Sequence, residues 1–309
     1  MTDVDASPSA TPAAIDAIPL RHPWRWVAAV VIVILVLLFL YGAATNKAFG
    51  WHTFAKYLFD KRVTEGAWNT LQLTVYAMVL AIVLGVILAV MRLSPNPVFR
   101  SVSWVYLWIF RGTPVYVQLV FWGLMPTIYK NIQLGVPFGP SFFHLNLQGL
   151  SIPFLLAIVG LALNEAAYMA EIIRAGISSV PEGQSEASTA LGMSWGMTMR
   201  RTVLPQAMRV IIPPTGNEVI SMLKTTSLVT AVPYTLDLYG ITSREIASRI
   251  FEPVPLLLVA ATWYLAVTSV LMVGQYYLER YFSRGASRKL TTKQLEALAK
   301  AQMTGEPHP

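Results

Sequence analysis

The chain has 309 residues, of which 55% are apolar and only 13% are charged, and its formal net charge is +7. An ordinary soluble domain carries about 25% charged residues, so this composition excludes a typical soluble protein and favours a membrane protein. The absence of cysteine excludes a disulfide framework and a thiolate metal site. No basic soluble domain stands out along the chain, so the positive charge points to membrane orientation rather than to nucleic acid.

About six windows in the sequence contain enough consecutive apolar residues, roughly 20, to cross a bilayer as helices. They cover residues 26–44, 67–90, 102–126, 152–173, 205–232 and 254–278. None shows the period-two alternation of a barrel strand, so we predict an all-α, polytopic helical bundle. The first window could instead belong to a signal peptide, but it is long for that role, and we expect a retained helix.

Charge and composition divide the chain further. The segments are a disordered cytoplasmic tail (1–22), an extra N-terminal transmembrane helix with an outside amphipathic segment (23–65), a membrane domain (66–282) and a cytoplasmic C-terminal tail (283–309). In the amphipathic part, residues 51–65, an interfacial helix and a simple aromatic belt are equally compatible with the sequence. With both termini in the cytoplasm, inside segments hold roughly twice as many Lys and Arg residues as outside segments, which the positive-inside rule favours.

The segment between the fourth and fifth windows is predicted to form two short helices. Ser179 and Glu182 have the spacing of a capping box, and the first helix runs until Gly192 provides a left-handed turn. Ser194 can cap the second helix, and Pro205 is expected to force a new helix start. Compact helices with an exposed apolar edge suit a docking surface for a partner.

This segment carries a specific motif. It reads Glu186-Ala187-Ser188, three residues, Gly192, nine residues, and then Thr202-Val203-Leu204-Pro205. The pattern resembles the EAA motif of permease subunits from binding-protein-dependent ABC importers, in which a coupling helix docks into the ATPase. Two positions depart from the family pattern, because Ser188 replaces an Ala and Thr202 replaces an Ile.

Three further segments narrow the resemblance. They are Phe110-Arg111-Gly112-Thr113-Pro114 followed by Val117-Gln118-Leu119, the stretch 167–176 (AYMAEIIRAG) and the stretch 223–228 (LKTTSL). All are similar to the permeases of the polar amino acid group, which serves histidine, glutamine, glutamate, arginine and opines. The matches extend over about residues 66–280.

The resemblance implies a type I ABC importer permease fold, with a five-helix core preceded by one extra helix. It implies translocation of polar amino acids by alternating access in a homo- or heterodimer of permease subunits. The partners would be an ABC ATPase dimer, an external substrate-binding protein, the amino acid and membrane lipid, with no nucleic acid. This chain would be no enzyme and would hold no cofactor or metal, because the partner ATPase would bind ATP-Mg. The location would be the bacterial cytoplasmic (inner) membrane.

The coupling loop, residues 178–205, would contact the ATPase. Its candidate residues are Glu186, Ala187, Ser188, Gly192, Trp195, Leu204 and Pro205. For Trp195, a contact with the ATPase and packing under the inner lipid headgroups are equally compatible with the sequence.

Ionisable residues inside the windows provide candidates for a substrate pathway, since one such charge at a helix centre costs about 2.5–3.5 kcal/mol on insertion. The candidate pathway residues are Arg111, Asn164, Glu165, Tyr168, Asn217, Glu218 and Lys224. Glu165 could receive the amino group of a substrate, and Arg111 or Lys224 could meet its carboxylate. Alternatively, these charges form salt bridges that hold the bundle or the dimer together.

Two further features concern helix structure. Glu171 and Arg174 are three residues apart and are expected to form a structural pair. Asn217 and Glu218 follow Pro213-Pro214, which is expected to break its helix.

Other transporter and enzyme classes fit the sequence less well. An ion- or proton-coupled secondary transporter would show inverted repeats and need no ATPase dock. A membrane enzyme would need a catalytic cluster, whereas the histidines at 22, 52, 144 and 308 lie in predicted tails or outside loops. Within the importer class, the main alternative is a permease for another small solute such as methionine.

Overall fold

The computed structural model describes residues 23–136, 140–149 and 152–282, so both predicted tails lie outside the described residues. The chain forms two units, residues 1–49 and 50–309. In the first unit, helix α1 (Pro23–Thr45) is followed by a 3-10 turn, Lys47–Phe49. The apolar residues of α1 form one uninterrupted helix that is long enough to cross a membrane.

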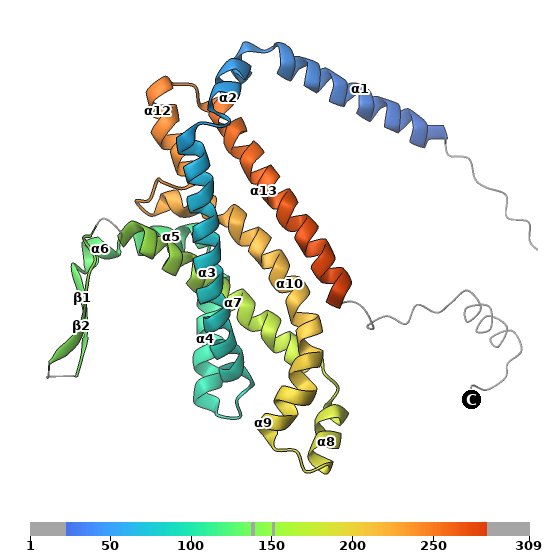
Figure 1. Cartoon of the computed structure of the whole chain (residues 1–309), viewed down its shortest axis with the longest axis vertical. Helices are drawn as coiled ribbons and strands as arrows, with labels where there is room; N and C mark the ends of the chain where they lie inside the picture. The colour runs from blue at the N-terminus through green and yellow to red at the C-terminus, as the bar shows by residue number, and fades with distance from the viewer. Residues whose placement is uncertain (1–22, 137–139, 150–151, 283–309) are drawn as a thin grey trace, which may run out of the picture. The chain divides into compact units, whose positions relative to one another are not determined.

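The second unit is almost entirely helical (Figure 1). Its elements are α2 (Trp51–Tyr57), α3 (Lys61–Leu93), α4 (Pro97–Gly112), α5 (Val115–Gly123), α6 (Met125–Ile128), β1 (Asn131–Gly135), β2 (Ser141–Asn146), α7 (Ile152–Ser178), α8 (Glu182–Ala190), α9 (Trp195–Thr198), a π-helical turn (Met199–Val203), α10 (Leu204–Thr225), a 3-10 turn (Thr226–Ala231), α11 (Leu238–Gly240), a second π-helical turn (Ile241–Ile246), α12 (Ala247–Ile250) and α13 (Pro253–Phe282). By length and composition, α3, α7 and α13 can each cross a membrane, as α1 can.

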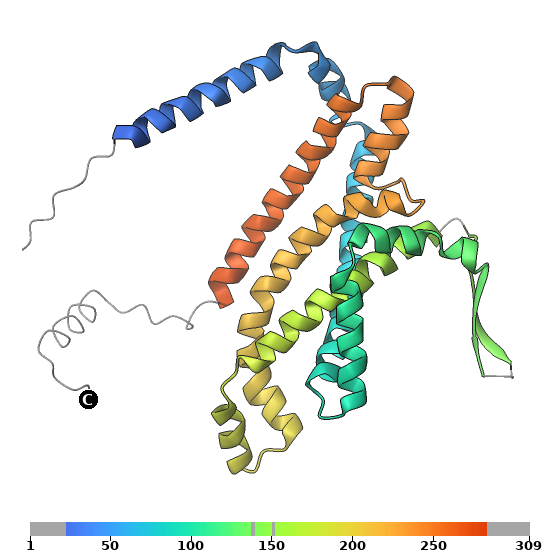
Figure 2. The ribbon, with the colours of Figure 1, turned by 180° about the vertical axis from the view of Figure 1, so that it is seen from behind.

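The third predicted window is not one helix, and in this respect the sequence-based expectation was wrong. The window is split into α4 and α5, which run in different directions in both views (Figures 1 and 2). Proline disfavours the α conformation of the residue before it, and Thr113 is accordingly extended, with φ −118° and ψ 145°. Pro114 then begins the new helix as its N-cap.

The fifth window differs in the opposite sense, because its prolines do not break the helix. Pro213 and Pro214 lie inside α10, which continues to Thr225. Gln275 of α13 donates a hydrogen bond of 2.7 Å to the carbonyl of Pro213, which ties the two helices together at this point. Proline has no N–H to donate to the carbonyl four residues earlier, so the carbonyls of Arg209 and Val210 lose that helical hydrogen bond while α10 continues past them.

The core of the second unit is the packing of α3 against α7, with α5 and α10 at its sides (Figure 2). Small residues permit a close approach of the helices, as is typical of membrane bundles. A Cβ atom added to Gly85 of α3 would lie 2.6 Å from the Cβ of Met169 and 3.1 Å from the backbone nitrogen of Ala170 in α7. Gly176 of α7 meets Ile211 of α10 with similarly little space.

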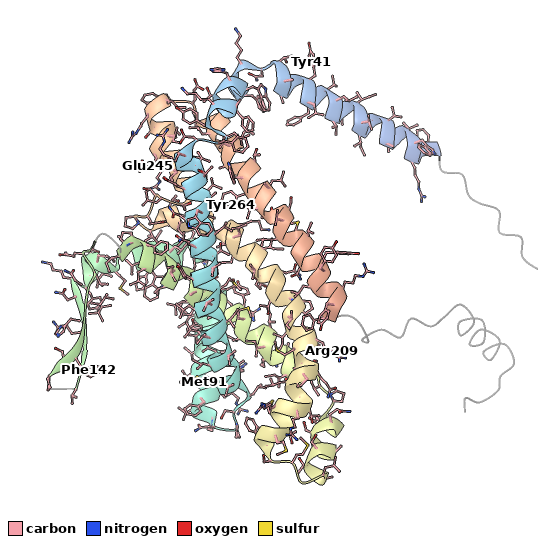
Figure 3. All side chains as sticks on the ribbon, viewed as in Figure 1. Tyr41, Met91, Phe142, Arg209, Glu245 and Tyr264 are labelled. Carbon is pink, nitrogen blue, oxygen red and sulfur yellow. The ribbon has the colours of Figure 1, made fainter. Side chains whose placement is uncertain are left out.

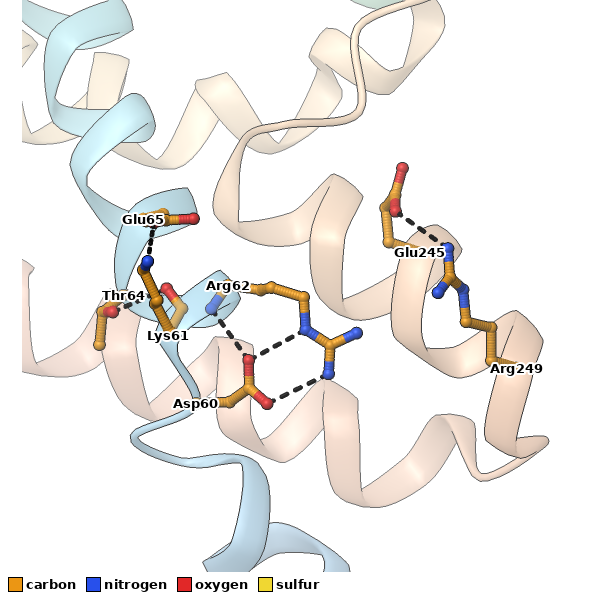
Figure 4. A network of polar contacts seen from close by, with 7 residues as sticks. All are labelled: Asp60, Lys61, Arg62, Thr64, Glu65, Glu245 and Arg249. Atoms are coloured by element: carbon orange, nitrogen blue, oxygen red, sulfur yellow. Dashed lines mark hydrogen bonds and ion pairs between the residues drawn. The ribbon is translucent and has the colours of Figure 1, made fainter.

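A second apolar cluster joins α2, the start of α3, the segment 238–247 and the start of α13. The predicted segment 51–65 thus contains the separate helix α2, and Asp60 begins α3 (Figure 4). Asp60 Oδ1 accepts a hydrogen bond of 2.9 Å from the backbone of Arg62, and the Arg62 side chain donates to both carboxylate oxygens at 3.1 Å. The hydrogen bonds from Arg62 hold the pKa of Asp60 below its usual value, so this cap is charged at neutral pH.

An antiparallel hairpin follows α6. Strands β1 and β2 pair from Asn131 opposite Asn146 to Gly135 opposite Ser141. Phe142 lies near the end of the hairpin that is remote from the helices (Figure 3), and its side chain is 77% exposed. Near the other end, Leu147 is buried and Leu145 packs against the same core, so the base of the hairpin is attached to the bundle.

Candidate functional site

A cavity of about 270 Å³ lies between α5, α7 and α10. Its walls combine apolar, hydroxyl and carboxyl side chains. They are Val115, Leu161, Asn164, Glu165, Tyr168, Glu218, Ser221, Met222 and Thr225. The cavity therefore brings together four of the predicted pathway residues, one of them on α10 and three on α7.

Two carboxyl groups dominate this cavity. Glu165 of α7 is only 7% exposed, and its Oε1 has no hydrogen-bond partner among the described residues. Glu218 of α10 lies close enough for the two carboxyl groups to interact with each other. No ion pair joins either one to a Lys or Arg in the described part of the chain. Two carboxyl groups that lie together without a counter-ion can share a proton, or can release it and bind a cation.

The break at Pro114 is stabilised by side chains from neighbouring helices. Because Pro114 has no N–H, the carbonyl of Phe110 loses its helical partner. Asn164 Nδ2 and Gln118 Nε2 each donate to this carbonyl at 3.0 Å. Gln118 also donates to the side chain of Thr113 at 2.7 Å and accepts from Asn164 at 3.1 Å. Asn164 thus lines the cavity and also joins α4, α5 and α7.

Gln118 is a residue of this site that reasoning from charge overlooked. It is uncharged, so a search for ionisable groups passes over it, although it is part of the segment Val117-Gln118-Leu119 that carries the family resemblance. Its spacing of four residues from Pro114 is the signal that could have identified it, since that spacing places the amide one helical turn beyond the break.

The remaining pathway candidates lie outside this cavity. Arg111 lines a separate cavity of about 490 Å³, and Lys224 lines another of about 610 Å³ together with Tyr116 and Tyr239. Asn217 is exposed on α10 and is not among the side chains that line the 270 Å³ cavity.

Glu171 and Arg174 form the structural pair that their spacing predicts. Arg174 Nε donates to Glu171 Oε2 at 3.0 Å, and a second hydrogen bond joins Arg174 Nη2 to Glu171 Oε1. This confirms the expectation of an ion pair within α7.

The coupling loop folds into α8 and α9 with Gly192 between them. Gly192 has φ +79°, the left-handed conformation that the sequence predicts. The predicted capping box of Ser179 and Glu182 was wrong, because Pro181 is the N-cap of α8. The Ser179 hydroxyl instead donates to the carbonyl of Gly176 at 2.7 Å. Ser194 occupies the N-cap of α9 without a side-chain hydrogen bond.

Pro205 does not start a separate helix, contrary to the sequence-based expectation. The chain passes from α9 through the π-helical turn 199–203 directly into α10. Proline is tolerated in the first turn of a helix, where its missing N–H is not needed. Pro205 occupies the first turn of α10, directly after the π-helical turn. The loop and the membrane helix are therefore continuous.

The surface of the coupling loop is strongly apolar at its tip. Leu191 is 82% exposed and Trp195 is 77% exposed, while Glu186 and Ala187 are exposed on α8. Trp195 also borders an apolar cavity of about 860 Å³ between α3, α7 and α10. An exposed apolar patch at such a loop is typical of a protein interface.

The two departures from the EAA pattern contact each other. Ser188 is buried, and its hydroxyl shares a hydrogen bond of 2.9 Å with the hydroxyl of Thr202. Ser188 also donates to the carbonyl of Gln184 at 2.8 Å. Ser188 and Thr202 thus form a polar pair at the positions that hold Ala and Ile in the family pattern. Their hydrogen bond connects α8 to the π-helical turn.

This contact predicts that the two positions depend on each other. Ser188→Ala alone leaves the half-buried hydroxyl of Thr202 without its partner, and we expect a loss of about 1 kcal/mol in stability together with weaker ATPase stimulation. The double variant Ser188→Ala/Thr202→Ile should recover most of the loss, since it replaces both partners. Thermal unfolding and ATPase assays of the assembled transporter measure the coupling energy. Purely additive effects of the two substitutions would contradict the prediction.

Comparison with known proteins agrees with this geometry. The family described as binding-protein-dependent transport system inner membrane component matches residues 81–284. The arginine transport system permease protein ArgU of Corynebacterium glutamicum is 61% identical over 306 residues, covering 98% of this chain and 95% of ArgU. The histidine/lysine/arginine/ornithine transport system permease protein HisM of Salmonella typhimurium is 38% identical over 223 residues, covering 71% of this chain and 89% of HisM.

Solved structures show the same fold. A chain of an amino acid ABC transporter crystallised with histidines has a TM-score of 0.59 and 32% identity, covering 74% of this chain and 97% of that chain. A chain of the methionine transporter MetNI has a TM-score of 0.55 at 20% identity, covering 72% of this chain and 96% of that chain, and supports the fold alone.

These relatives exclude the secondary transporter and the membrane enzyme, since permeases of this kind leave ATP hydrolysis to a separate ATPase. They also confirm the polytopic, all-α membrane fold. The chain belongs to the permease subunits of binding-protein-dependent ABC importers, in the group that transports amino acids.

Proposed function

We propose that this permease carries cationic amino acids, with arginine as the preferred substrate. The observation that supports this most directly is the pair of carboxyl groups in the 270 Å³ cavity, Glu165 and Glu218, which have no Lys or Arg partner among the described residues. A guanidinium group is planar and offers several N–H donors, so it can bind both carboxylates at once. The 61% identity to an arginine transport permease supports the same substrate.

The translocation mechanism that we propose is alternating access in a dimer of permease subunits. An ATPase dimer would dock against Glu186, Ala187, Gly192 and Trp195 and would bind ATP-Mg, so this chain would need no cofactor or metal. Ser188, Leu204 and Pro205 would hold the docking helices on α10. An external binding protein would deliver the amino acid at the opposite end of the bundle.

The proposed orientation places both termini in the cytoplasm of a bacterium, with the chain in its inner membrane. It is supported by the arrangement of the second unit, in which α8 and α9 lie at one end and α2 and α12 at the other (Figure 1). The end with α8 and α9 also carries Arg200 and Arg201, and positive charge is typical of cytoplasmic segments.

A binding measurement tests the substrate without the selectivity of the binding protein. The permease assembled with its ATPase in detergent is titrated with arginine and with citrulline, a neutral isostere in which oxygen replaces one guanidinium nitrogen. Charge-assisted hydrogen bonds contribute about 1.5–3 kcal/mol, so arginine should bind at least about tenfold more tightly. Equal affinities would contradict the proposed substrate, and lysine and ornithine should compete with arginine while glutamine should not.

A further inference from the structure

A second cavity lies next to the cavity of about 270 Å³ that contains Glu165 and Glu218, which is called the carboxylate cavity. Its volume is about 490 Å³, and its walls are Arg92, Trp104, Leu107, Trp108, Arg111, Gly112, Tyr168 and Glu171. Tyr168 lines both cavities, so its side chain stands between them. On α7, Glu165, Tyr168 and Glu171 follow one another at intervals of three residues, which places them along one side of the helix.

Arg111 packs on Tyr168 from α4. The guanidinium carbon of Arg111 lies 5.4 Å from the centre of the Tyr168 ring, which is the geometry of a cation–π interaction. Glu171 lines the same cavity as Arg111, but its carboxylate is already paired with Arg174. The charge of Arg111 is therefore not neutralised by an ion pair among the described residues.

Resting on the proposed function, we propose that Arg111 and Tyr168 form the inner gate of the carboxylate cavity. A cavity with two carboxyl groups attracts Na⁺, K⁺ and protons as well as a cationic amino acid. A fixed positive charge on its inner side excludes such cations electrostatically, as arginine does in other membrane pores. The ring of Tyr168 holds this charge in place and narrows the passage.

The same pair can distinguish an amino acid from an inorganic cation. A passing amino acid carries a carboxylate, and a hydrogen-bonded pair of guanidinium and carboxylate is stronger than a cation–π contact. The substrate therefore offers Arg111 a better partner than Tyr168, whereas Na⁺ or K⁺ does not. Arg111 lies two residues before Thr113, where α4 ends. Its backbone is therefore close to the point at which the chain changes direction between α4 and α5.

The experiment uses the complete transporter in proteoliposomes, with the ATPase and the binding protein present. Efflux of radioactive Na⁺ is measured without ATP, and arginine uptake per ATP hydrolysed is measured with ATP. Arg111→Gln and Tyr168→Leu should each raise Na⁺ efflux several-fold and lower the uptake per ATP. Arg100→Gln removes the same charge from the same helix at a position that lines neither cavity and serves as the matched control, and Arg111→Lys should restore a low efflux.

Unchanged Na⁺ efflux and unchanged coupling in both gate variants would overturn the gate. If Arg111→Gln does not assemble, Tyr168→Leu tests the same contact from the other side. Failure of the proposed substrate is distinguishable, because it shows as equal affinity for arginine and citrulline in unmodified protein. In that case, a raised Na⁺ efflux in the Arg111 and Tyr168 variants still supports the gate. Unchanged Na⁺ efflux in these variants, together with a clear preference of the unmodified protein for arginine, refutes the gate and leaves the proposed substrate standing.

Discussion

Gly192→Val is expected to abolish the stimulation of ATP hydrolysis by substrate, while the permease remains in the membrane. Gly192 has φ +79°, and an ordinary residue held in this region costs about 1–2 kcal/mol, with more for a β-branched side chain. The strain is relieved when the turn between α8 and α9 opens, which moves Glu186 and Trp195 away from the positions that we propose for docking. Stimulated ATPase activity of the purified complex should fall by at least about tenfold.

The matched control is Gly183→Val, on the neighbouring helix α8. A Cβ atom at Gly183 meets no other atom within 4 Å, and its φ is ordinary, so this variant should keep most of its activity. Glu186→Lys tests the same surface by charge, because a reversed charge that meets a like charge across an interface weakens binding. Normal coupled uptake in both Gly192→Val and Glu186→Lys would refute the docking assignment.

Glu165→Gln and Glu218→Gln are expected to remove the preference for cationic substrates. Each substitution keeps the shape of the side chain and removes one carboxyl group from the cavity. Loss of one charge-assisted hydrogen bond corresponds to about 1.5–3 kcal/mol, so the affinity for arginine should fall about ten- to a hundredfold. The double variant should bind arginine and citrulline with similar affinity, which direct titration of the permease–ATPase complex measures.

Glu65→Gln is a suitable control for these variants. Glu65 forms an exposed pair with Lys61 at 3.8 Å, and such surface pairs contribute little to stability. Its arginine affinity should equal that of the unmodified protein. If Glu165→Gln and Glu218→Gln also retain full affinity, the carboxyl groups serve the packing of α7 against α10 and not the substrate.

Long apolar segments were predicted well because their signal is a sum over many residues. The stretches around α1, α3, α7 and α13 each exceed the length of a bilayer core, so no single residue decides them. The left-handed turn at Gly192 was also predictable, since glycine tolerates that conformation without a steric cost. The Glu171–Arg174 pair followed from helical spacing alone.

The effect of proline was predicted wrongly in two ways, as a helix break that was not expected and as expected breaks that do not occur. Its effect depends on the groups that surround it. Pro114 ends a helix in a segment apolar enough to cross the membrane, and Gln118 and Asn164 supply the donors that make the break stable. Pro205 and Pro213 leave α10 intact, and Gln275 of α13 holds the two helices together at Pro213 by a hydrogen bond to its carbonyl. Donors that come from distant parts of the sequence cannot be recognised without the fold.

The cavity was predicted only in part for the same reason. Glu165 and Tyr168 share one side of α7 by their spacing, which the sequence shows directly. That Glu218 of α10 faces them, and that Asn217 beside it does not line the cavity, depends on how α10 packs against α7. No pattern within either helix determines this rotation.

The uninterrupted run from α9 through the π-helical turn into α10 makes Trp195 and Glu218 parts of one continuous helical segment. A helix from residue 195 to residue 225 spans roughly 45 Å at 1.5 Å per residue. A shift imposed on Trp195 would reach the cavity without first deforming a loop. Removing a single residue from the α-helical stretch between Leu204 and Glu218 would rotate everything beyond it by about 100° relative to α9, turning the carboxyl group of Glu218 away from α7 while leaving the composition of both ends unchanged.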